Sequence, residues 1–328
     1  MYTLGIETSC DETSCAILKN YNVLSNITLS SLREHKKYGG VIPEIASRAH
    51  LKNIDKVLKL TQEKSGISLE KIELIAVTSR PGLIGALLVG LNFAKALSLA
   101  LKIPFIGINH LHAHLFAPFL NGQAKVQFPL LGAVISGGHT EFYLVNDFDK
   151  IKTIGRACDD ACGEVFDKVA VNYNLGYPGG PLIDRLFKPE YKEEFRLKCG
   201  RKGFNLSFSG IKTALIYKKI EMEKKGLFDK KMKIKLLSSF QHTIMGTIIS
   251  TIASAAERLK VKRVVLGGGV VANNHLRSLL KEYKPEMNIL LAPLEYCGDN
   301  AAVVAGFGFY LYNRKGFKSN IGIGAEAN

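Results

Sequence analysis

Three histidines lie close together in the segment Asn109-His110-Leu111-His112-Ala113-His114. On a helix, His110 and His114 lie one turn apart on the same face, a spacing that lets two imidazoles bind one metal ion, while His112 points elsewhere. Two such histidines can also be ordinary surface residues that bind no ligand. Their position directly after an apolar strand, where open α/β sheets bind their ligands, makes a metal site as plausible as ordinary surface histidines.

A metal site needs a third ligand, and Asp299 in Cys297-Gly298-Asp299-Asn300 is the best candidate. It stands at the start of a late helix, just after a strand. Two histidines and one carboxylate leave coordination positions open for substrate, which suits Fe(II) or Zn(II). Asp299 could equally be a plain helix N-cap. The pattern does not fit a zinc peptidase, because Leu, His and Ala separate the outer histidines and no Glu follows the first one.

Glycine-rich turns provide a second kind of candidate site. The turn Ser136-Gly137-Gly138-His139 joins two strands and could hold phosphates through backbone N–H groups, or could simply close a hairpin. Tyr177 to Pro181 form a rigid turn, and Asp184 after it could bind ribose hydroxyls or merely begin a helix. Gly267-Gly268-Gly269 lacks the dinucleotide and P-loop patterns. These turns support a nucleotide-site hypothesis.

Strands and helices that alternate in two similar halves must position these residues. In the first half we expect strands at 2–8, 13–18, 23–29, 72–78 and 103–108, with helices from 43 and at 83–101. In the second half we expect strands at 130–135, 140–145, 263–266 and 289–292, with helices at 164–173, 236–259, 274–281 and 300–312. This order predicts two α/β lobes with a cleft between them.

Length and composition limit the possible classes of protein. A chain of 328 residues that is 47% hydrophobic and 22% charged is long enough for two folded domains and is not disordered. Six cysteines form no secretory disulfide framework, so we expect a reduced, cytoplasmic setting. The N-terminus shows no signal peptide. The apolar stretch 83–101 contains Asn92 and Lys95, which indicates a buried helix rather than a membrane span.

The charge balance points to a polyanionic partner. The 44 Lys and Arg outnumber the 29 Asp and Glu and give a net charge of +15. Basic residues concentrate between about 196 and 235, where a solvated helical face or a phosphate-binding surface would both explain them. Cys158 and Cys162 are four residues apart, but no second pair accompanies them, which favours buried thiols over a metal pair.

Taken together, the motifs resemble the tRNA N6-adenosine threonylcarbamoyltransferase family of bacterial type along nearly the whole chain. The matching segments are GIETSCDETS (5–14), GGVIPEIASRAH (39–50), PGLIGALLVG (81–90), NHLHAH (109–114), ISGGHTE (135–141), DDACGEVFDKVA (159–170), YPGGPLID (177–184), FSGIKTA (208–214), GGVVANNHLR (268–277) and CGDNAA (297–302).

The resemblance implies an actin/Hsp70/hexokinase-like fold with duplicated RNase H-like domains. The expected boundaries are an N-terminal lobe at 1–115, a C-terminal lobe at 116–295 with a lysine-rich helical insertion at about 190–235, and a C-terminal helix at 296–328 that returns toward the N-terminal lobe. The implied activity is transfer of the threonylcarbamoyl group from threonylcarbamoyl-AMP to N6 of adenosine at tRNA position 37. Companions would be a paralogous subunit of the same fold and a small P-loop ATPase, with no membrane.

The resemblance also implies roles for particular residues. One metal ion, most simply Fe(II), with Zn(II) as the alternative, would be held by His110, His114 and Asp299. Asp11 and Glu12 match an acidic pair near the reaction centre, and one of them could accept the proton of the amine. The adenylate, or ATP or ADP, would be bound by Ile135, Ser136, Gly137, Gly138, His139, Asp167, Gly180, Asp184 and Asn273.

The chain departs from the family at three positions. Arg80 replaces a usual Gly, Gly298 replaces a frequent Thr, and Val134 stands where archaeal relatives have a metal-binding tyrosine. Two other functions remain as alternatives. The paired hairpins alone would also suit an ATP-dependent small-molecule kinase of the same superfamily, and the basic surface would also suit a non-catalytic tRNA-binding scaffold.

Overall fold

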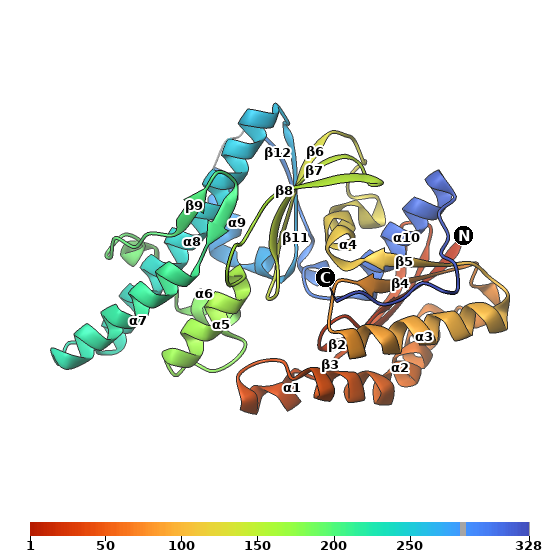
Figure 1. Cartoon of the computed structure of the whole chain (residues 1–328), viewed down its shortest axis with the longest axis horizontal. Coiled ribbons are helices and arrows are strands. Elements are labelled where there is room, and N and C mark those ends of the chain that lie inside the picture. Colours follow the sequence, from red (N-terminus) through yellow and green to blue (C-terminus); the bar gives the residue numbers. More distant parts are fainter. Residues whose placement is uncertain (283–286, 328) are drawn as a thin grey trace. The chain divides into compact units, whose positions relative to one another are not determined.

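Two five-stranded sheets organise the chain (Figure 1). The structure is a computed structural model that describes residues 1–282 and 287–327. Each sheet belongs to its own compact unit. Unit 1 comprises Met1–Val126 and Ala292–Asn328, and unit 2 comprises Gln127–Leu291.

The sheet of unit 1 combines an antiparallel meander with two parallel strands. The meander is β1 (Tyr2–Glu7), β2 (Glu12–Lys19) and β3 (Asn22–Ser30), and the parallel strands are β4 (Leu74–Arg80) and β5 (Phe105–Asn109). Their order is β3-β2-β1-β4-β5. Since β1, β4 and β5 run parallel, their carboxyl ends meet at one edge of the sheet, where such sheets place their ligand sites.

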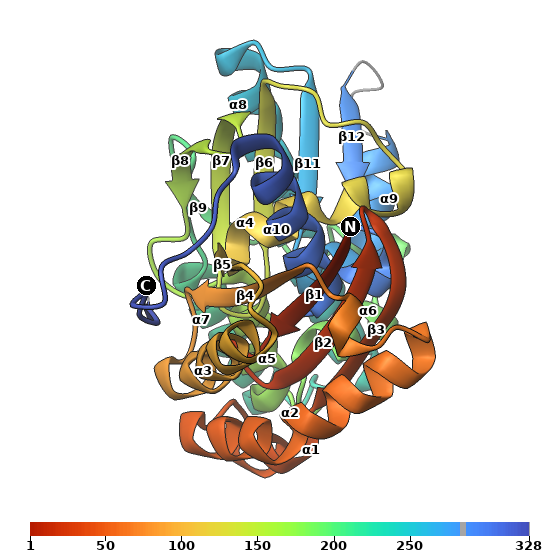
Figure 2. The same cartoon turned by 90° about the vertical axis from the view of Figure 1, so that its right-hand side faces the viewer.

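Helices cover both faces of this sheet. Unit 1 contains α1 (Leu32–His35), α2 (Pro43–Ser65), α3 (Ile84–Leu101), α4 (His110–Phe116) and α10 (Ala301–Lys315). The helices α2 and α3 lie on one face and α10 on the other (Figure 2). Apolar side chains from β1, β4, α2 and α3, such as Ile6, Val77, Val57 and Leu91, form the buried core. These packed strands fix the loops at the edge of the sheet.

The apolar helix α3 is less buried than predicted. It is long and apolar enough to cross a membrane by length and composition, yet only 33% of this stretch is buried. One face packs on β4 and α2, while Ile84, Leu88 and Leu99 are exposed. The expectation of a buried helix was therefore wrong for one face, because the apolar pattern runs around the whole helix and carries no information on which face packs.

The sheet of unit 2 repeats the topology of unit 1. Its strands are β6 (Leu130–Ile135), β7 (Thr140–Asp147), β8 (Lys150–Arg156), β11 (Arg263–Gly267) and β12 (Asn288–Leu291), in the order β12-β11-β6-β7-β8. An antiparallel meander is again followed by two parallel strands. The structural repeat expected from the two hairpins is therefore confirmed.

Helices and short elements complete unit 2. The helices are α5 (Cys162–Asn172), α6 (Gly179–Leu186), α7 (Ser209–Lys224), α8 (Lys230–Leu259) and α9 (Asn274–Glu282), and β9 (Gly200–Lys202) pairs with β10 (Asn205–Ser207). Single 3-10 turns occur in both units at Lys36–Tyr38, Leu69–Lys71, Ala117–Gly122, Pro189–Tyr191, Gly269–Ala272 and Leu294–Tyr296. The sequence did not predict β8, β9 or β10, whereas α7 lies within the helical insertion expected at about 190–235.

The long helix α8 begins earlier than the predicted residue 236. Asp229 caps it by accepting a 2.6 Å hydrogen bond from the backbone N–H of Met232. The lysines that follow the cap therefore belong to the helix, although they weaken the apolar periodicity on which the prediction depended.

Candidate active site

The helix α4 presents two histidines at the edge of the unit 1 sheet. It follows β5 directly, and the Asn109 side chain caps it by accepting a 3.0 Å hydrogen bond from the backbone N–H of His112. His110 and His114 are both buried, and their ring centroids lie 4.6 Å apart. The one-turn spacing in the sequence therefore brings the two imidazoles together.

Asp299 lies on the short segment before α10. Asn300, and not Asp299, caps that helix, since its side-chain oxygen accepts a 3.2 Å hydrogen bond from the backbone N–H of Val303. The Asn300 amide also donates to the carbonyl of Gly298 at 2.7 Å, which fixes the segment. The N-cap explanation of Asp299 is therefore wrong, and its carboxylate is left to face the histidines.

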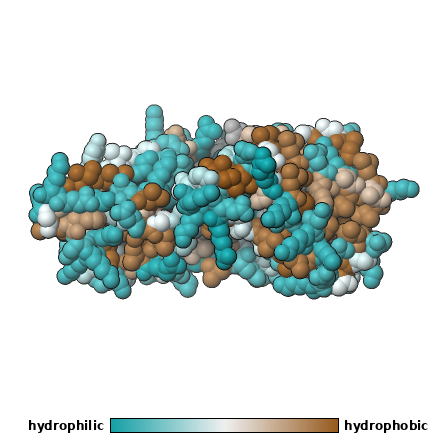
Figure 3. All heavy atoms as spheres, turned by 90° about the horizontal axis from the view of Figure 1, so that it is seen from below, coloured by the Kyte–Doolittle hydropathy of each residue, from teal (hydrophilic) through white to brown (hydrophobic). Residues whose placement is uncertain are grey.

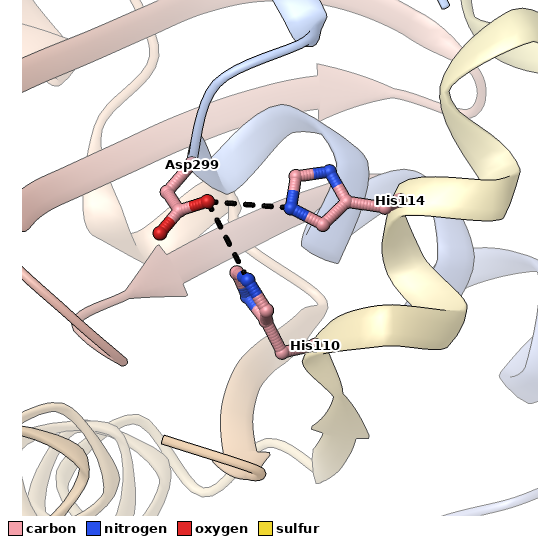
Figure 4. A group of neighbouring side chains, drawn as sticks. All are labelled: His110, His114 and Asp299. Carbon is pink, nitrogen blue, oxygen red and sulfur yellow. Dashed lines mark hydrogen bonds and ion pairs between the residues drawn. The ribbon is translucent and has the colours of Figure 1, made fainter. Parts of the chain in front are cut away.

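The three side chains converge on one point (Figure 4). The Oδ1 atom of Asp299 lies 3.3 Å from Nε2 of His114 and 3.4 Å from Nε2 of His110. One potential ligand atom from each residue lies within 4.8 Å of the others. Two imidazole nitrogens and one carboxylate form a donor set that suits Fe(II) or Zn(II). The residues therefore fit a divalent metal ion.

The charges around this point favour a cation. Burial alone would raise the pKa of Asp299, but attraction to His110 and hydrogen bonds from His110 and His114 hold it well below its usual range. Burial alone would lower the pKa of His110, but the Asp299 and Glu7 carboxylates raise it well above its usual value. Carboxylates on both sides of an imidazole make a site in which positive charge is stabilised.

Sequence reasoning missed Glu7, which contacts His110. Its carboxylate is 1% exposed and lies 2.9 Å from Nδ1 of His110. Burial would raise the pKa of Glu7, but the interaction with His110 holds it below its usual range. The only signal in the sequence is an acidic residue at the end of an otherwise apolar strand, which alone does not identify its partner.

Asp11 lies between β1 and β2, and Glu12 is the first residue of β2, in the same unit as the histidines. Burial, then Asp299, then Asp11 raise the pKa of Glu12 well above its usual value. A carboxylate with a raised pKa is a stronger base when ionised, which suits proton transfer. The hydroxyl of Ser30 lies 3.4 Å from Asp11 Oδ2 and 3.3 Å from Glu12 Oε1.

Another buried histidine, which sequence reasoning also missed, holds the acidic loop. His50 donates from Nε2 to the carbonyl of Cys10 at 3.0 Å and accepts at Nδ1 from the hydroxyl of Thr13 at 2.8 Å. This pairing leaves one neutral tautomer, and burial lowers the pKa of His50. His50 is the last residue of the motif at 39–50, so the role of that motif includes positioning the loop.

In unit 2 the glycine turn lies against the start of α5. Its own contacts are a 2.8 Å bond from the N–H of Ser136 to the carbonyl of His139 and a 3.1 Å bond from the N–H of His139 to Oγ of Ser136. The N–H of Gly163 donates to the Ser136 carbonyl at 3.1 Å. Within the described residues, the N–H groups of Gly137 and Gly138 donate no hydrogen bond, which leaves them available for a phosphate.

The glycine loop after β11 packs on the end of β6. Gly268 has a φ of 97°, and a Cβ there would lie 2.5 Å from the carbonyl oxygen of Ile135. Only glycine fits both constraints. Ile135 is fully buried, so its backbone supports the turn that follows it.

The other predicted adenylate residues lie in unit 2, and most already have protein partners. Asp167 accepts a 2.6 Å bond from the N–H of Gly179, which closes the turn before α6. Asp184 accepts from the Gln241 amide at 2.8 Å and from the backbone and side chain of Asn274 at 3.0 and 2.8 Å. Asp184 therefore joins α6, α8 and α9, and its binding to ribose stays a prediction.

Asn273 and Gly180 complete the predicted set. The side chain of Asn273 caps α9 by accepting a 2.9 Å bond from the N–H of Leu276. A Cβ at Gly180 would meet no atom of the described chain within 4 Å. Gly180 therefore has open space beside it, whereas Asn273 has a structural role whether or not it binds nucleotide.

Arg80 and the two neighbouring cysteines were also singled out in the sequence. Arg80, one of the departures from the family pattern, pairs with Glu326 at 3.0 Å. Cys158 is exposed and Cys162 is buried, and both are free thiols. The expectation of buried thiols is therefore confirmed for Cys162 and wrong for Cys158.

Comparison with known proteins identifies close relatives. A family model described as tRNA N6-adenosine threonylcarbamoyltransferase matches residues 22–306. Proteins of that name from Thermosipho africanus and Dictyoglomus turgidum are 45% and 42% identical to this chain. The first alignment covers 100% of this chain and 99% of the relative, and the second covers 99% and 98%.

Solved structures share the fold at low identity. Full-length HypF in its phosphate- and nucleotide-bound form has a TM-score of 0.62 at 12% identity, and the match covers 97% of this chain and 56% of HypF. Component A of the Acidaminococcus fermentans (R)-2-hydroxyglutaryl-CoA dehydratase has a TM-score of 0.52 at 16% identity and covers 96% and 100%. These matches confirm the predicted actin/Hsp70/hexokinase-like fold class.

Proposed function

The chain belongs to the tRNA N6-adenosine threonylcarbamoyltransferase family, and we propose that its donor is threonylcarbamoyl-AMP and its target the adenosine at tRNA position 37. The protein is an acyltransferase that forms threonylcarbamoyladenosine in tRNA. The kinase and scaffold alternatives are not favoured, because the relatives share one transferase name along the whole chain.

The convergence of His110, His114 and Asp299 is the observation that supports the mechanism most strongly. We propose that these side chains hold one divalent ion, Fe(II) or, as the alternative, Zn(II). When bound, this ion would supply Lewis acidity that polarises the carbonyl of the carbamoyl group. The Asp299 and Glu7 carboxylates beside the imidazoles would favour positive charge at this site.

Side chains and backbone groups of the protein would act on the attacking amine and on the departing phosphate. The N6 amine attacks the carbamoyl carbon, the bond from that carbon to the phosphate oxygen breaks, and AMP leaves. Glu12, whose pKa is raised by burial and by Asp299, would accept the proton from N6. The N–H groups of Gly137 and Gly138 would stabilise the phosphate. Most of the rate enhancement would come from positioning, since the adenine amine is a weak nucleophile.

Product analysis tests this function. Purified protein loaded with Fe(II) is incubated with threonylcarbamoyl-AMP and an anticodon stem-loop that carries adenosine at position 37, and the digested RNA is analysed by mass spectrometry. We expect threonylcarbamoyladenosine in this RNA and none in a control with guanosine at position 37. Product in the control would contradict the proposed position. A phosphorylated metabolite in a substrate screen, without modified RNA, would favour the kinase.

The lysine-rich insertion would bind the tRNA backbone, but only some of its lysines have charges that are available. The ammonium groups of Lys218 and Lys225 pair with Glu221 at 2.9 and 2.6 Å, and Lys235 pairs with Glu194. Lys219 and Lys233 donate to the backbone carbonyls of Asn172 and Tyr173. Among the eight lysines from 218 to 235, the exposed remainder is Lys224, Lys230 and Lys231.

Charge reversal should show whether the exposed lysines contribute to tRNA binding and the paired lysines do not. The variant Lys224→Glu, Lys230→Glu, Lys231→Glu is expected to weaken tRNA binding and to lower the slope of log Kd against log salt by about 2 to 3, because about 0.9 counterion is released per phosphate contact. Binding is measured by filter retention between low and physiological salt. The control variant Lys218→Gln, Lys225→Gln should keep the wild-type slope. An unchanged slope in the first variant would remove this surface from the tRNA interface.

A hydrophobic face of unit 1 supports a protein partner. Leu51 on α2 and Leu88 on α3 are 66% and 42% exposed, and they line a hollow of about 310 Å³ together with Ile54, Val89, Asn92 and Phe93. Hydrophobic side chains gather over α2 and α3 in Figure 3. Exposed apolar patches of this kind mark interaction sites. We propose that a paralogous subunit of the same fold binds here.

We also propose that a small P-loop ATPase assists the complex and that the protein acts in the cytoplasm.

Substitution in this face tests the partner proposal. The variant Leu51→Glu, Leu88→Glu is expected to lose the complex with the purified same-fold subunit, because two buried charges without partners would oppose association. Light scattering after size-exclusion chromatography measures the mass of the complex. The control Leu294→Glu changes an exposed leucine of unit 1 outside α2 and α3 and should leave the complex intact. A complex that forms equally well with the double variant would place the partner elsewhere.

A further inference from the structure

We infer that Glu7 is a positioning residue for the metal centre and that it fixes the tautomer of His110. This inference rests on the proposed metal centre and adds to it a residue that is not itself a ligand. Three neighbouring strand ends meet at this residue. Glu7 ends β1, Thr78 lies near the end of the adjacent β4, and His110 follows β5.

The surroundings of Glu7 are those of an ionised carboxylate. The backbone N–H of Ser9 donates to Oε1 at 2.5 Å, and the hydroxyl of Thr78 donates to Oε2 at 2.6 Å. The same Oε2 lies 2.9 Å from Nδ1 of His110. A carboxylate this deeply buried is stable only when such donors compensate for lost hydration. Its position is therefore set by groups at or just after the ends of three neighbouring strands.

The contact with Glu7 determines which ring nitrogen of His110 faces the metal position. An ionised carboxylate can only accept hydrogen bonds, so Nδ1 of His110 must carry the proton. The lone pair is then on Nε2, the atom that lies 3.4 Å from Asp299. A carboxylate behind a histidine ligand orients the ring and raises its basicity. One series of hydrogen bonds thus runs from Thr78 through Glu7 to His110 and ends at the proposed metal position.

The second histidine lacks this support. Nδ1 of His114 is buried and has no hydrogen-bond partner among the described residues, while its Nε2 lies 3.3 Å from Asp299. The two imidazoles are therefore not equivalent. His110 has a carboxylate behind the ring, whereas Nδ1 of His114 has no partner among the described residues, so the removal of Glu7 should affect one ligand selectively.

The substitution Glu7→Gln tests the inference because it keeps the size and removes the charge. If the new NH₂ group replaces Oε2, His110 must accept at Nδ1 and the Nε2 lone pair is lost. If the NH₂ group replaces Oε1, it faces the N–H of Ser9, and two donors then meet without an acceptor. Either arrangement should weaken metal binding, and we expect the Kd for Zn(II), measured by chelator competition, to rise about 10- to 100-fold. The control Glu73→Gln alters an exposed carboxylate that accepts from the N–H of Tyr2 and should retain the wild-type Kd.

A second measurement separates positioning from general destabilisation. In Zn(II)-loaded protein labelled with ¹⁵N-histidine, His110 should show a slowly exchanging Nδ1–H proton shifted downfield by the Glu7 carboxylate. This signal should move upfield or disappear in Glu7→Gln and persist in Glu73→Gln. A Glu7→Gln protein with the wild-type Kd and an unchanged signal would overturn the inference.

The outcome is decisive even if Glu7→Gln does not fold. Thr78→Val then removes one donor from the same carboxylate, and it should raise the Kd about threefold and shift the Nδ1–H signal. An unchanged Kd and signal in Thr78→Val would equally overturn the role of the hydrogen bonds that link Thr78 to Glu7 and Glu7 to His110. A wild-type protein that binds no metal would instead contradict the metal centre itself, so the two failures can be told apart.

Discussion

A protein carrying His110→Ala and His114→Ala is expected to lose its bound metal and its transferase activity together while keeping its fold. The double substitution removes two of the three converging ligands and leaves Asp299 alone. One carboxylate cannot replace two imidazoles, because nitrogen donors supply most of the affinity for Fe(II) or Zn(II). We expect the metal content to fall to background and the yield of threonylcarbamoyladenosine to fall by at least about a hundredfold.

The fold should survive because the apolar side chains that pack α4 into the core, such as Leu111, Leu115 and Phe116, are unchanged. Loss of the imidazoles leaves the buried Glu7 carboxylate with one donor fewer, which should lower the free energy of unfolding by about 1 to 3 kcal/mol. Metal analysis, product mass spectrometry and urea unfolding measure the three quantities. The control His112→Ala, on the same helix but outside the converging set, should keep metal and activity. Full activity of the double variant without metal would rule out the metal mechanism.

Local patterns explain why the sequence predicted the topology and the ligand set. The alternation of apolar strands and amphipathic helices gave both sheets, and the one-turn spacing of His110 and His114 placed them on one face of α4. Their approach to Asp299 across 185 residues was a hypothesis from its place after a late strand, and the resemblance to a family supported it. Spacing alone could not distinguish a ligand from an N-cap, a role that the structure gives to Asn300.

The features that the sequence did not reveal depend on contacts between distant segments. Glu7 meets Thr78 and His110 at separations of 71 and 103 residues, and no local pattern encodes these pairings. The lysine-rich insertion shows the same limit, since a run of like charges does not tell which members pair with Glu221 or Glu194. Composition therefore overestimates the charge available for tRNA.

The substitution Gly163→Ala is expected to impair adenylate binding through the backbone of the glycine turn. A Cβ at this position would lie 2.8 Å from both the Cα of Gly137 and the carbonyl oxygen of Ser136. These are backbone atoms that cannot rotate away, so α5 or the turn must shift. The bond from the N–H of Gly163 to the Ser136 carbonyl, 3.1 Å long, would lengthen. We expect a loss of about 1 to 3 kcal/mol in the free energy of unfolding.

Two further glycines separate adenylate binding from stability. A Cβ at Gly246, within α8, meets no atom within 4 Å, so Gly246→Ala should stabilise the protein by up to about 1 kcal/mol and bind AMP normally. A Cβ at Gly137 also meets open space, so Gly137→Ala should fold normally but obstruct a phosphate bound at the turn. Calorimetry with AMP should therefore show a Kd at least about tenfold higher for Gly163→Ala and for Gly137→Ala, a loss of ~1.4 kcal/mol in binding free energy, but not for Gly246→Ala. Both variants should keep the wild-type metal content, because the three proposed ligands lie in unit 1. Wild-type affinity for AMP in both would exclude the turn from the nucleotide site.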